Sequence, residues 1–279
     1  MSGMLVLVPT PIGNLGDISP RAVSALEDAD FIAAEDTRVS VKLLNHLNLK
    51  KPLVSYHEHN KQHSGAQILE RILSGETCAL VTDAGMPAIS DPGEDLVRLC
   101  AQAGVRVTAI PGPCAAITAL AISGLPTNRF TFEGFLSAHK KNRREHLRSL
   151  QTETRTMIFY EAPHKLTSTL DEFLETFGPS RHITLCRELT KLHEEVLRMT
   201  LQTAVDYYTT NIPRGEYVLI VEGTSPAPRE TPSIEDCLCS IRLLQETGSS
   251  LKDAVRQVSH NSGIPKNTLY TAALSMDQE

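Results

Sequence analysis

The chain has 279 residues, 41% of them hydrophobic, and a formal net charge of −6 at pH 7. It is long enough for two domains with real hydrophobic cores. Its acidic balance excludes a protein that is basic over its whole surface, so a nucleic-acid partner must be held by a local basic patch. No apolar run is long enough to span a bilayer, and the short one at the start lacks a basic flank. We therefore expect neither a membrane segment nor a signal peptide.

The cysteine and histidine patterns favour neither disulfides nor metals. The six cysteines show no CxxC spacing, and His57 and His59 would point to opposite faces of a strand. Solvated loop histidines therefore explain this pair better than a metal site. Free cysteines fit a reducing compartment. We expect no bound metal and a cytoplasmic protein.

Short apolar runs alternate with helical patterns through the first half of the chain. We expect strands within 4–8, 31–34, 54–60, 77–82 and 105–110. We expect a helix after Ser19 and further helices within 38–48, 68–73, 96–103 and 114–123. This alternation is typical of a mostly parallel α/β sheet. We assign it to an N-terminal α/β domain over residues 1–124.

The loop after the strand at 79–82 is the most informative stretch. Residues 83–93 (DAGMPAISDPG) hold two Gly and two Pro between a buried strand and a helix, and loops at the carboxyl ends of strands are where open α/β folds bind ligands. The loop at 9–18 and the PGP segment at 111–113, followed by a helix of small residues, have the same character. The alternative is an ordinary set of connections with close helix packing. No GxxxxGK[ST] or GxGxxG pattern follows a strand, which argues against a kinase, an NTPase or a common dehydrogenase.

The second half combines a further α/β domain with a basic run. We expect strands within 130–135, 156–160, 182–186, 195–201 and 217–221, mostly antiparallel, with a hairpin at 189–194, and assign residues 125–223 to this domain. Residues 137–148 contain one Glu and five cationic residues, which are Lys140, Lys141, Arg143, Arg144 and Arg148. This excess of positive charge favours a phosphate-binding surface for RNA over a merely solvated helix face.

A Pro-rich linker at 224–232 precedes a small helical domain at 233–279. Its expected helices, 234–245, 251–259 and 266–274, resemble a helix-turn-helix. Its positive charges are few, so docking to RNA or plain packing explains it better than DNA binding.

Seven sequence blocks occur together and in order: PTPIGNLGDIS (9–19), AAEDTR (33–38), DAGMPAISDPG (83–93), PGPCA (111–115), FYEAPHK (159–165), RELTKLHEE (187–195) and RGEYVLIVEG (214–223). This series resembles the bacterial ribosomal RNA small-subunit methyltransferase I family, which belongs to the tetrapyrrole-methylase-like class. The resemblance implies an S-adenosylmethionine-dependent enzyme that 2′-O-methylates a cytidine of 16S rRNA in the small ribosomal subunit. It also implies two α/β domains with the cofactor between them, and a homodimer.

The resemblance also implies which residues contact the cofactor: Pro11, Asp83, Gly85, Pro87, Ala88, Ile89, Ser90, Cys114, Ala115 and Tyr160. Met86 and Cys114 stand where the family pattern has Thr and Ser, so backbone contacts are expected at these two positions. The loops at 9–18, 83–93 and 111–113 are also expected to face a ligand from their own residue pattern. The assignment of Tyr160 depends mainly on the resemblance to the family.

A ribose 2′-hydroxyl is a poor nucleophile, so the reaction requires positioning and either a base or a cation that stabilises the developing alkoxide. We expect Lys191, with a lowered pKa, or Glu188 to assist deprotonation, while Arg187 and Arg38 hold phosphates. The alternative is that these residues form structural salt bridges.

Two other functions fit parts of the sequence. A small-molecule methyltransferase of the tetrapyrrole type should lack the basic run and the C-terminal helices. A non-catalytic nucleic-acid-binding protein built on the tail would leave the ligand-facing loops unexplained.

Overall fold

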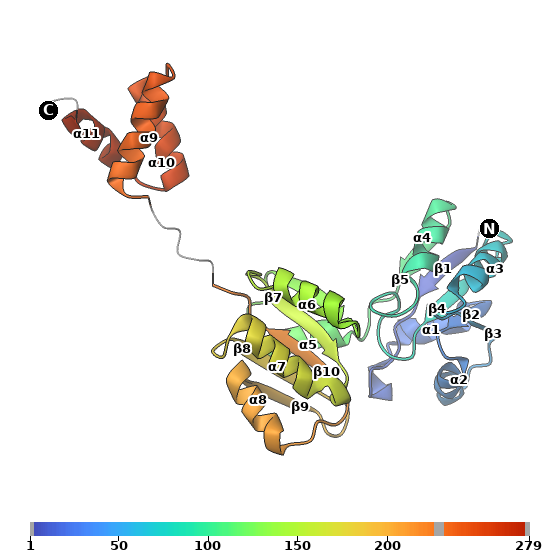
Figure 1. The fold of residues 1–279 in the computed structure, drawn as a ribbon. Helices are drawn as coiled ribbons and strands as arrows, with labels where there is room; N and C mark the ends of the chain where they lie inside the picture. Colours follow the sequence, from blue (N-terminus) through green and yellow to red (C-terminus); the bar gives the residue numbers. More distant parts are fainter. Residues whose placement is uncertain (1–2, 226–231, 277–279) are drawn as a thin grey trace. The chain divides into compact units, whose positions relative to one another are not determined.

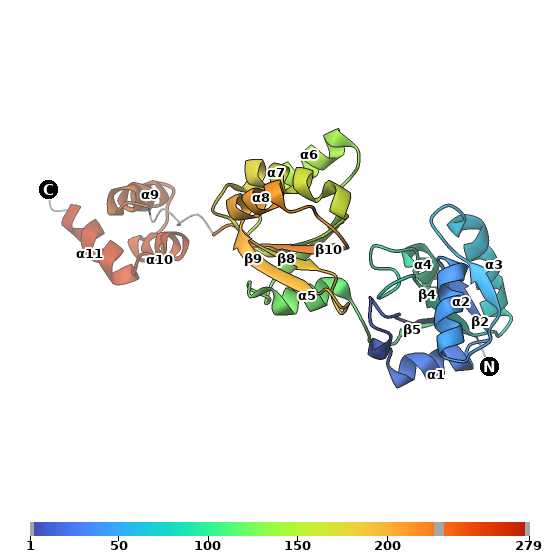
Figure 2. The ribbon, with the colours of Figure 1, turned by 90° about the horizontal axis from the view of Figure 1, so that it is seen from below.

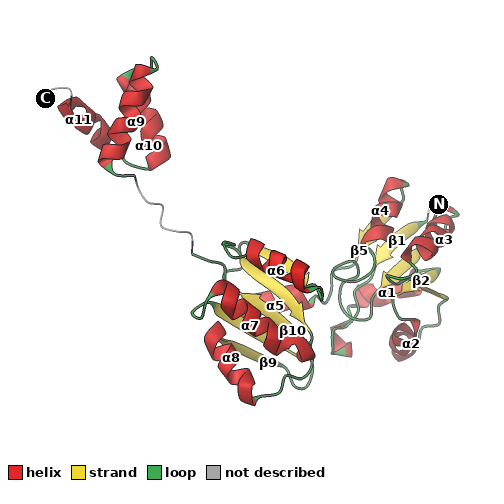
Figure 3. Ribbon diagram, in the orientation of Figure 1, coloured by secondary structure: helices red, strands yellow, loops and turns green. Residues whose placement is uncertain are grey.

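The computed structural model describes residues 3–225 and 232–276, and the chain divides after Thr224 into two compact units. The larger unit holds two five-stranded sheets, and the smaller one is helical (Figures 1 and 3). Most of the expected linker falls on 226–231, outside the described residues. No helix within 3–225 or 232–276 is long and apolar enough to cross a membrane.

The first sheet is parallel throughout, as the alternation predicted. Its strands follow the order β3-β2-β4-β1-β5 and are β1 (Met4–Leu7), β2 (Phe31–Ala34), β3 (Leu53–Ser55), β4 (Cys78–Val81) and β5 (Arg106–Ala109). Apolar side chains of α1 (Pro20–Asp28) and α2 (Thr37–His46) pack on one face, and those of α3 (Lys61–Leu73) and α4 (Glu94–Gln102) on the other. Because both faces are covered, β2 and β4 are buried along their whole length.

The second sheet is mostly antiparallel, with the order β6-β7-β10-β8-β9 and only β6 and β7 parallel. Its strands are β6 (Phe130–Phe135), β7 (Thr156–Glu161), β8 (His182–Arg187), β9 (Glu195–Thr200) and β10 (Tyr217–Val221). Figure 2 shows α6 (Lys140–Ser149), α7 (Leu166–Phe177) and α8 (Leu201–Thr210) on one face and α5 (Ala115–Ser123) on the other. The antiparallel pairing and the β8–β9 hairpin were both expected.

One helix packs on a different sheet from the one we expected. We placed α5 in the N-terminal domain, but its buried Ala116, Ala119 and Leu120 pack against Ile158 and Val218 of the second sheet. Its small residues allow this close approach, and Gly124, in the left-handed conformation, ends the helix. The chain therefore passes to the second sheet before α5, and a boundary at 124 would separate this helix from its packing partners.

The C-terminal unit contains the three expected helices, α9 (Ile234–Glu246), α10 (Leu251–Ser262) and α11 (Lys266–Met276). Ser233 forms a capping box with Asp236 at the start of α9, and Ser250 caps α10. The three helices share a small core of their own, which includes Ile241, Val255 and Leu269.

Candidate active site

Two loops from neighbouring strands of the first sheet lie side by side. Because β1 and β4 pair in parallel, the loops that follow them leave the same edge of the sheet. Thr10 and Gly85 join the loops through a pair of backbone hydrogen bonds of 2.9 and 3.0 Å. Gly85 has φ +88°, and a Cβ there would lie 3.3 Å from Ile12. This close approach explains why the loop requires glycine.

Backbone strain is concentrated at the candidate site. Among the described residues, five other than Gly have positive φ. Two of them, Ala88 and Ser90, lie in the loop after β4, and two more, Glu188 and Thr190, lie in the loop after β8. A β-branched Thr at φ +66° is costly, and such conformations collect at functional sites.

The loops after β1 and β8 meet at a glycine. A Cβ on Gly13 would lie 2.5 Å from Cγ of Lys191 and 2.9 Å from Oγ1 of Thr190. Only a residue without a side chain fits this contact. The strained loop of the second sheet is thus held directly against a loop of the first sheet.

A cavity of about 450 Å³ lies among these loops, within the usual range for small-molecule sites. Five of the predicted cofactor residues line it: Gly85, Ile89, Cys114, Ala115 and Tyr160. Its walls are largely apolar, and three carboxylates, those of Asp91, Glu161 and Glu216, lie among its lining residues.

The other predicted cofactor residues do not line this cavity. Pro11 and Asp83 line a smaller one of about 210 Å³ beside α2. Pro87, Ala88 and Ser90 belong to the loop after β4 without lining either cavity, because the loop turns through Ala88 and Ser90 at positive φ.

Sequence reasoning missed several residues that line the main cavity. Among them are Asp91, Phe135, Glu161, Cys186 and Glu216. Asp91 lies within a loop that we had singled out, and Glu161 follows Tyr160 directly. Glu216 is the third residue of the RGEY block, so the motif indicated the region but not the role of this side chain. Phe135 and Cys186 read as ordinary strand residues.

Acidic groups surround the end of β4. Glu35 accepts hydrogen bonds from Oγ1 of Thr82 at 2.6 Å and from the amide of Asp83 at 3.5 Å. Burial, reinforced by the nearby Glu35 carboxylate, raises the pKa of Asp91 to about 6 and also raises the pKa of Asp83. Asp91 is the member of this group that lines the main cavity, where its carboxylate favours a cationic ligand.

Lys191 is held by two carboxylates. Its Nζ donates to Oε1 of Glu188 at 2.9 Å and to Oε2 of Glu216 at 2.8 Å. Burial alone would lower the pKa of Lys191, but these two hydrogen bonds outweigh it and the pKa is raised. The expectation of a lowered pKa is wrong, since the family motif did not reveal Glu216 as a second partner. Lys191 is therefore a fixed cation at the edge of the cavity.

Arg187 does not join this group. It lies on β8 next to Cys186, and because side chains alternate along a strand, the two point to opposite faces. Cys186 faces the cavity, whereas Nε of Arg187 donates to Glu195 at 3.0 Å. Arg38 is exposed at the start of α2 and bonded to Asp36. The structure thus brings together Glu188 and Lys191 but not Arg187.

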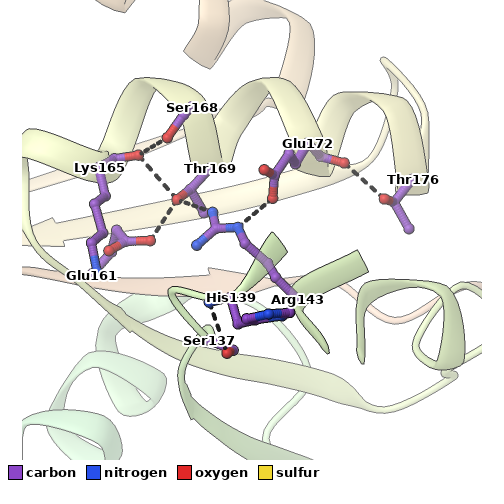
Figure 4. Close-up of polar contacts among 9 residues, drawn as sticks. All are labelled: Ser137, His139, Arg143, Glu161, Lys165, Ser168, Thr169, Glu172 and Thr176. Atoms are coloured by element: carbon purple, nitrogen blue, oxygen red, sulfur yellow. Dashed lines mark hydrogen bonds and ion pairs between the residues drawn. The ribbon is translucent and has the colours of Figure 1, made fainter. Parts of the chain in front are cut away.

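Four of the five cations predicted to bind RNA are exposed on α6: Lys140, Lys141, Arg144 and Arg148. Arg143 differs, because it is buried. Figure 4 shows it pointing at α7, where it pairs with Glu172 and donates to Oγ1 of Thr169 at 2.7 Å. The same hydroxyl is bonded to Glu161, a wall of the cavity. Arg143 is thus a structural link between α6 and the cavity wall, and its assignment to the RNA surface is wrong.

The comparisons with known proteins agree with this geometry. The family model for Tetrapyrrole (Corrin/Porphyrin) Methylases matches residues 4–205. The chain belongs to this family. It is 46% identical over 277 residues to "Ribosomal RNA small subunit methyltransferase I" of Synechocystis sp., covering 99% of each chain. It is 47% identical to the protein of the same name from Halalkalibacterium halodurans, covering 96% of this chain and 93% of that one.

Solved structures share the fold of this family member at low sequence identity. The crystal structure of diphthine synthase superposes with a TM-score of 0.62 at 14% identity, covering 81% of this chain and 92% of that chain. This identity supports the fold alone.

The two adjacent arginines of α6 provide a test of the buried link. Arg143→Ala should lower the free energy of unfolding by about 1–3 kcal/mol, because it leaves Glu172 and Thr169 without their partner; the partial exposure of Glu172 limits the loss. Arg144→Ala, on the exposed face, should change it by less than about 0.5 kcal/mol. Urea unfolding followed by circular dichroism measures both. Equal stability of the two variants would show that Arg143 has no structural role.

The raised pKa of Asp91 predicts a pH-dependent stability. The folded state holds this proton up to about pH 6, whereas an unfolded Asp loses it near its ordinary pKa of 3.8. The contribution of Asp91 is therefore complete below the lower pKa and is lost as the pH rises through the higher one. Asp91→Asn cannot ionise, so its stability relative to the natural protein should increase from pH 4 to pH 7. A constant difference across this range in urea unfolding would exclude the shift.

Proposed function

We propose that the protein is an S-adenosylmethionine-dependent methyltransferase that modifies the 2′-hydroxyl of a cytidine in 16S rRNA of the small ribosomal subunit. The observation that carries this proposal is the likeness, over 99% of both chains, to a relative named as a ribosomal RNA small subunit methyltransferase I. The likeness extends over the basic helix α6 and the C-terminal helices, which a small-molecule methylase would not need. The tetrapyrrole alternative is therefore not favoured.

The chemistry of the cavity fits the cofactor. S-Adenosylmethionine carries a sulfonium and an amino group, both positively charged, and the residues that line the cavity include Asp91 and Glu216 and, among the described residues, neither Lys nor Arg. Glu161 also lines the cavity, but its carboxylate is bonded to Thr169 and to the amide of Ala162. The apolar walls of the cavity, which include Ile89 and Tyr160, suit an adenine ring. We assign cofactor contacts to the five predicted residues that line it and to Asp91. The ring of Tyr160 is positioned by a 3.2 Å hydrogen bond from the amide of Ala116 to its hydroxyl.

The cofactor when bound supplies an electrophilic methyl group with a neutral thioether as its leaving group. The residues of the chain then have to orient the ribose and take the proton of the 2′-hydroxyl. The Glu216 carboxylate lines the cavity and is mostly exposed, so it is the group that accepts this proton. Lys191 stays charged between Glu216 and Glu188 and stabilises the negative charge that develops on the ribose oxygen.

Exposed cations complete the RNA-binding surface. Lys140, Lys141, Arg144 and Arg38 contact backbone phosphates in this proposal, where the release of counterions favours binding. The C-terminal helical unit docks on ribosomal RNA. A cytoplasmic location and a homodimer follow from the resemblance to the family and belong to the same proposal.

Transfer of labelled methyl is the direct test. Small ribosomal subunits that lack the modification are offered alongside naked 16S rRNA and a tetrapyrrole precursor, with labelled S-adenosylmethionine as donor. We expect label on a ribose 2′-oxygen of the subunit, which nuclease digestion and chromatography identify. Label on the tetrapyrrole alone would refute the RNA assignment, and failure to bind the cofactor would favour a non-catalytic protein.

Lys191 provides a test of the mechanism. Lys191→Ala should lower the single-turnover methylation rate by roughly 10²- to 10⁴-fold, because it removes the cation opposite the developing alkoxide. Lys191→Arg keeps the charge and should retain part of the rate. Leu192→Ala, at the neighbouring position with an almost fully exposed side chain, is the matched control. An unchanged rate for Lys191→Ala would exclude a catalytic role for this residue.

A further inference from the structure

Phe135 combines a large apolar ring with high exposure at the mouth of the cavity. It lines the cavity and is 59% exposed. Phe132 and Phe130, on the same strand, are 37% and 38% exposed. The strand is β6, at the edge of the second sheet. An exposed row of aromatic rings is costly in water and marks an interaction surface when it borders a binding site.

A β-bulge is the device that turns Phe135 toward the cavity. The register between β6 and β7 shifts between Phe132 and Gly134, so that Phe132 pairs with Ile158 and Phe135 pairs with Tyr160. Without the extra residue, Gly134 would occupy the place of Phe135. The bulge places both rings next to Tyr160, with ring centroids 5.2 and 5.5 Å from it.

The bulge also touches the strained loop of the first sheet. Gly134 has φ +62°, and a Cβ there would lie 3.3 Å from Oγ of Ser90. Tyr160 is in turn anchored to α5 through the amide of Ala116. Phe135 is thus presented by a rigid support, which lowers the entropic cost of ordering it against a ligand.

Positive charge begins five residues beyond Phe135. Lys141, Arg144 and Arg148 lie three and four residues apart on α6, so they form one exposed stripe about 10 Å long. The only acidic residue of α6, Glu145, lies 4.0 Å from Lys141, at the limit of an ion pair. Arg143 fixes this helix to α7 and, through Thr169, to Glu161 in the cavity wall (Figure 4).

We propose that Phe135 is the surface on which an unpaired base of the RNA substrate stacks at the mouth of the cavity, while phosphates elsewhere on the same RNA bind the exposed stripe of α6. The exposed ring of Phe135 suits the bases of a single-stranded nucleic acid, and the exposed cations of α6, which follow it in the chain, suit its phosphates. An enzyme that modifies a single nucleotide has to unstack it from the neighbouring bases, and an aromatic ring at the mouth of the cavity can hold the unstacked base in place. The inference deepens the proposed function and rests on it.

The test compares variants of Phe135 in the full-length protein. Phe135→Leu removes the aromatic face but keeps an apolar side chain, so folding is preserved; Phe135→Trp keeps a stacking ring. Leu73→Ala, on α3, is the control, because Leu73 is exposed to the same degree as Phe135 (60%) and does not line the cavity. Filter binding measures affinity for unmodified small ribosomal subunits, and calorimetry measures affinity for S-adenosylmethionine.

We expect Phe135→Leu to weaken subunit binding roughly 5- to 150-fold, the range for one stacked base, with cofactor affinity changed less than about twofold. Phe135→Trp should bind like the natural protein, and so should Leu73→Ala. Unchanged subunit affinity for Phe135→Leu, or a failure of Phe135→Trp to restore it, would overturn the inference. A loss confined to cofactor binding would also overturn it, since Phe135 would then contact only the cofactor.

The labelled-methyl assay on the same proteins separates the two proposals. If the natural protein transfers no methyl to ribose but Phe135→Leu still weakens subunit binding, the proposed function fails and the stacking surface stands. If methyl transfer occurs and Phe135→Leu binds normally, the function stands and the stacking surface fails.

Discussion

The parallel pairing of β1 with β4 is the constraint on which the candidate site depends. Strands that run in parallel end at the same edge of the sheet, so the loops at 9–18 and 82–93 leave together, and the backbone bonds between Thr10 and Gly85 join them. Gly13 continues this arrangement, because its missing side chain lets Thr190 and Lys191, in the loop of the second sheet, approach the loop after β1. The loops beside the cavity are thus assembled by backbone hydrogen bonds and by close approaches at Gly13 and Gly85. These two positions do not tolerate a larger residue.

The free energy that orders these loops has to come from the rest of the fold. Ala88, Ser90, Glu188 and Thr190 adopt left-handed conformations that cost about 1–3 kcal/mol each in unfavourable cases. The two sheets can hold them because both faces of each sheet are packed with apolar side chains. A rigid scaffold with strained loops at its edge is a common arrangement for an active site, since the loops cannot relax away from their ligand.

Charge is divided between two regions of the larger unit. The cavity carries carboxylates, which suit a cationic cofactor, whereas the exposed side of α6 carries cations, which suit a polyanion. Arg143, Thr169 and Glu161 connect these two regions through buried polar contacts. In the proposed function, a methyl donor and an RNA acceptor would meet at the cavity, where Phe135 and Tyr160 lie. The overall charge of −6 conceals this division, because it averages over opposite local fields.

The sequence by itself determined the α/β alternation, the antiparallel second sheet, the three C-terminal helices and the three Gly- and Pro-containing loops beside the cavity. These follow from local patterns, namely apolar periodicity, Ser and Asp caps, and Gly or Pro at turns. Only the tertiary structure decided that α5 packs on the second sheet, that Arg143 is buried while Arg144 is exposed, and that Glu216 meets Lys191. Each of these depends on which surfaces come together across many residues of chain. The bulge at Gly134 also belongs here, because it changes the face of Phe135 without leaving a periodic signal in the sequence.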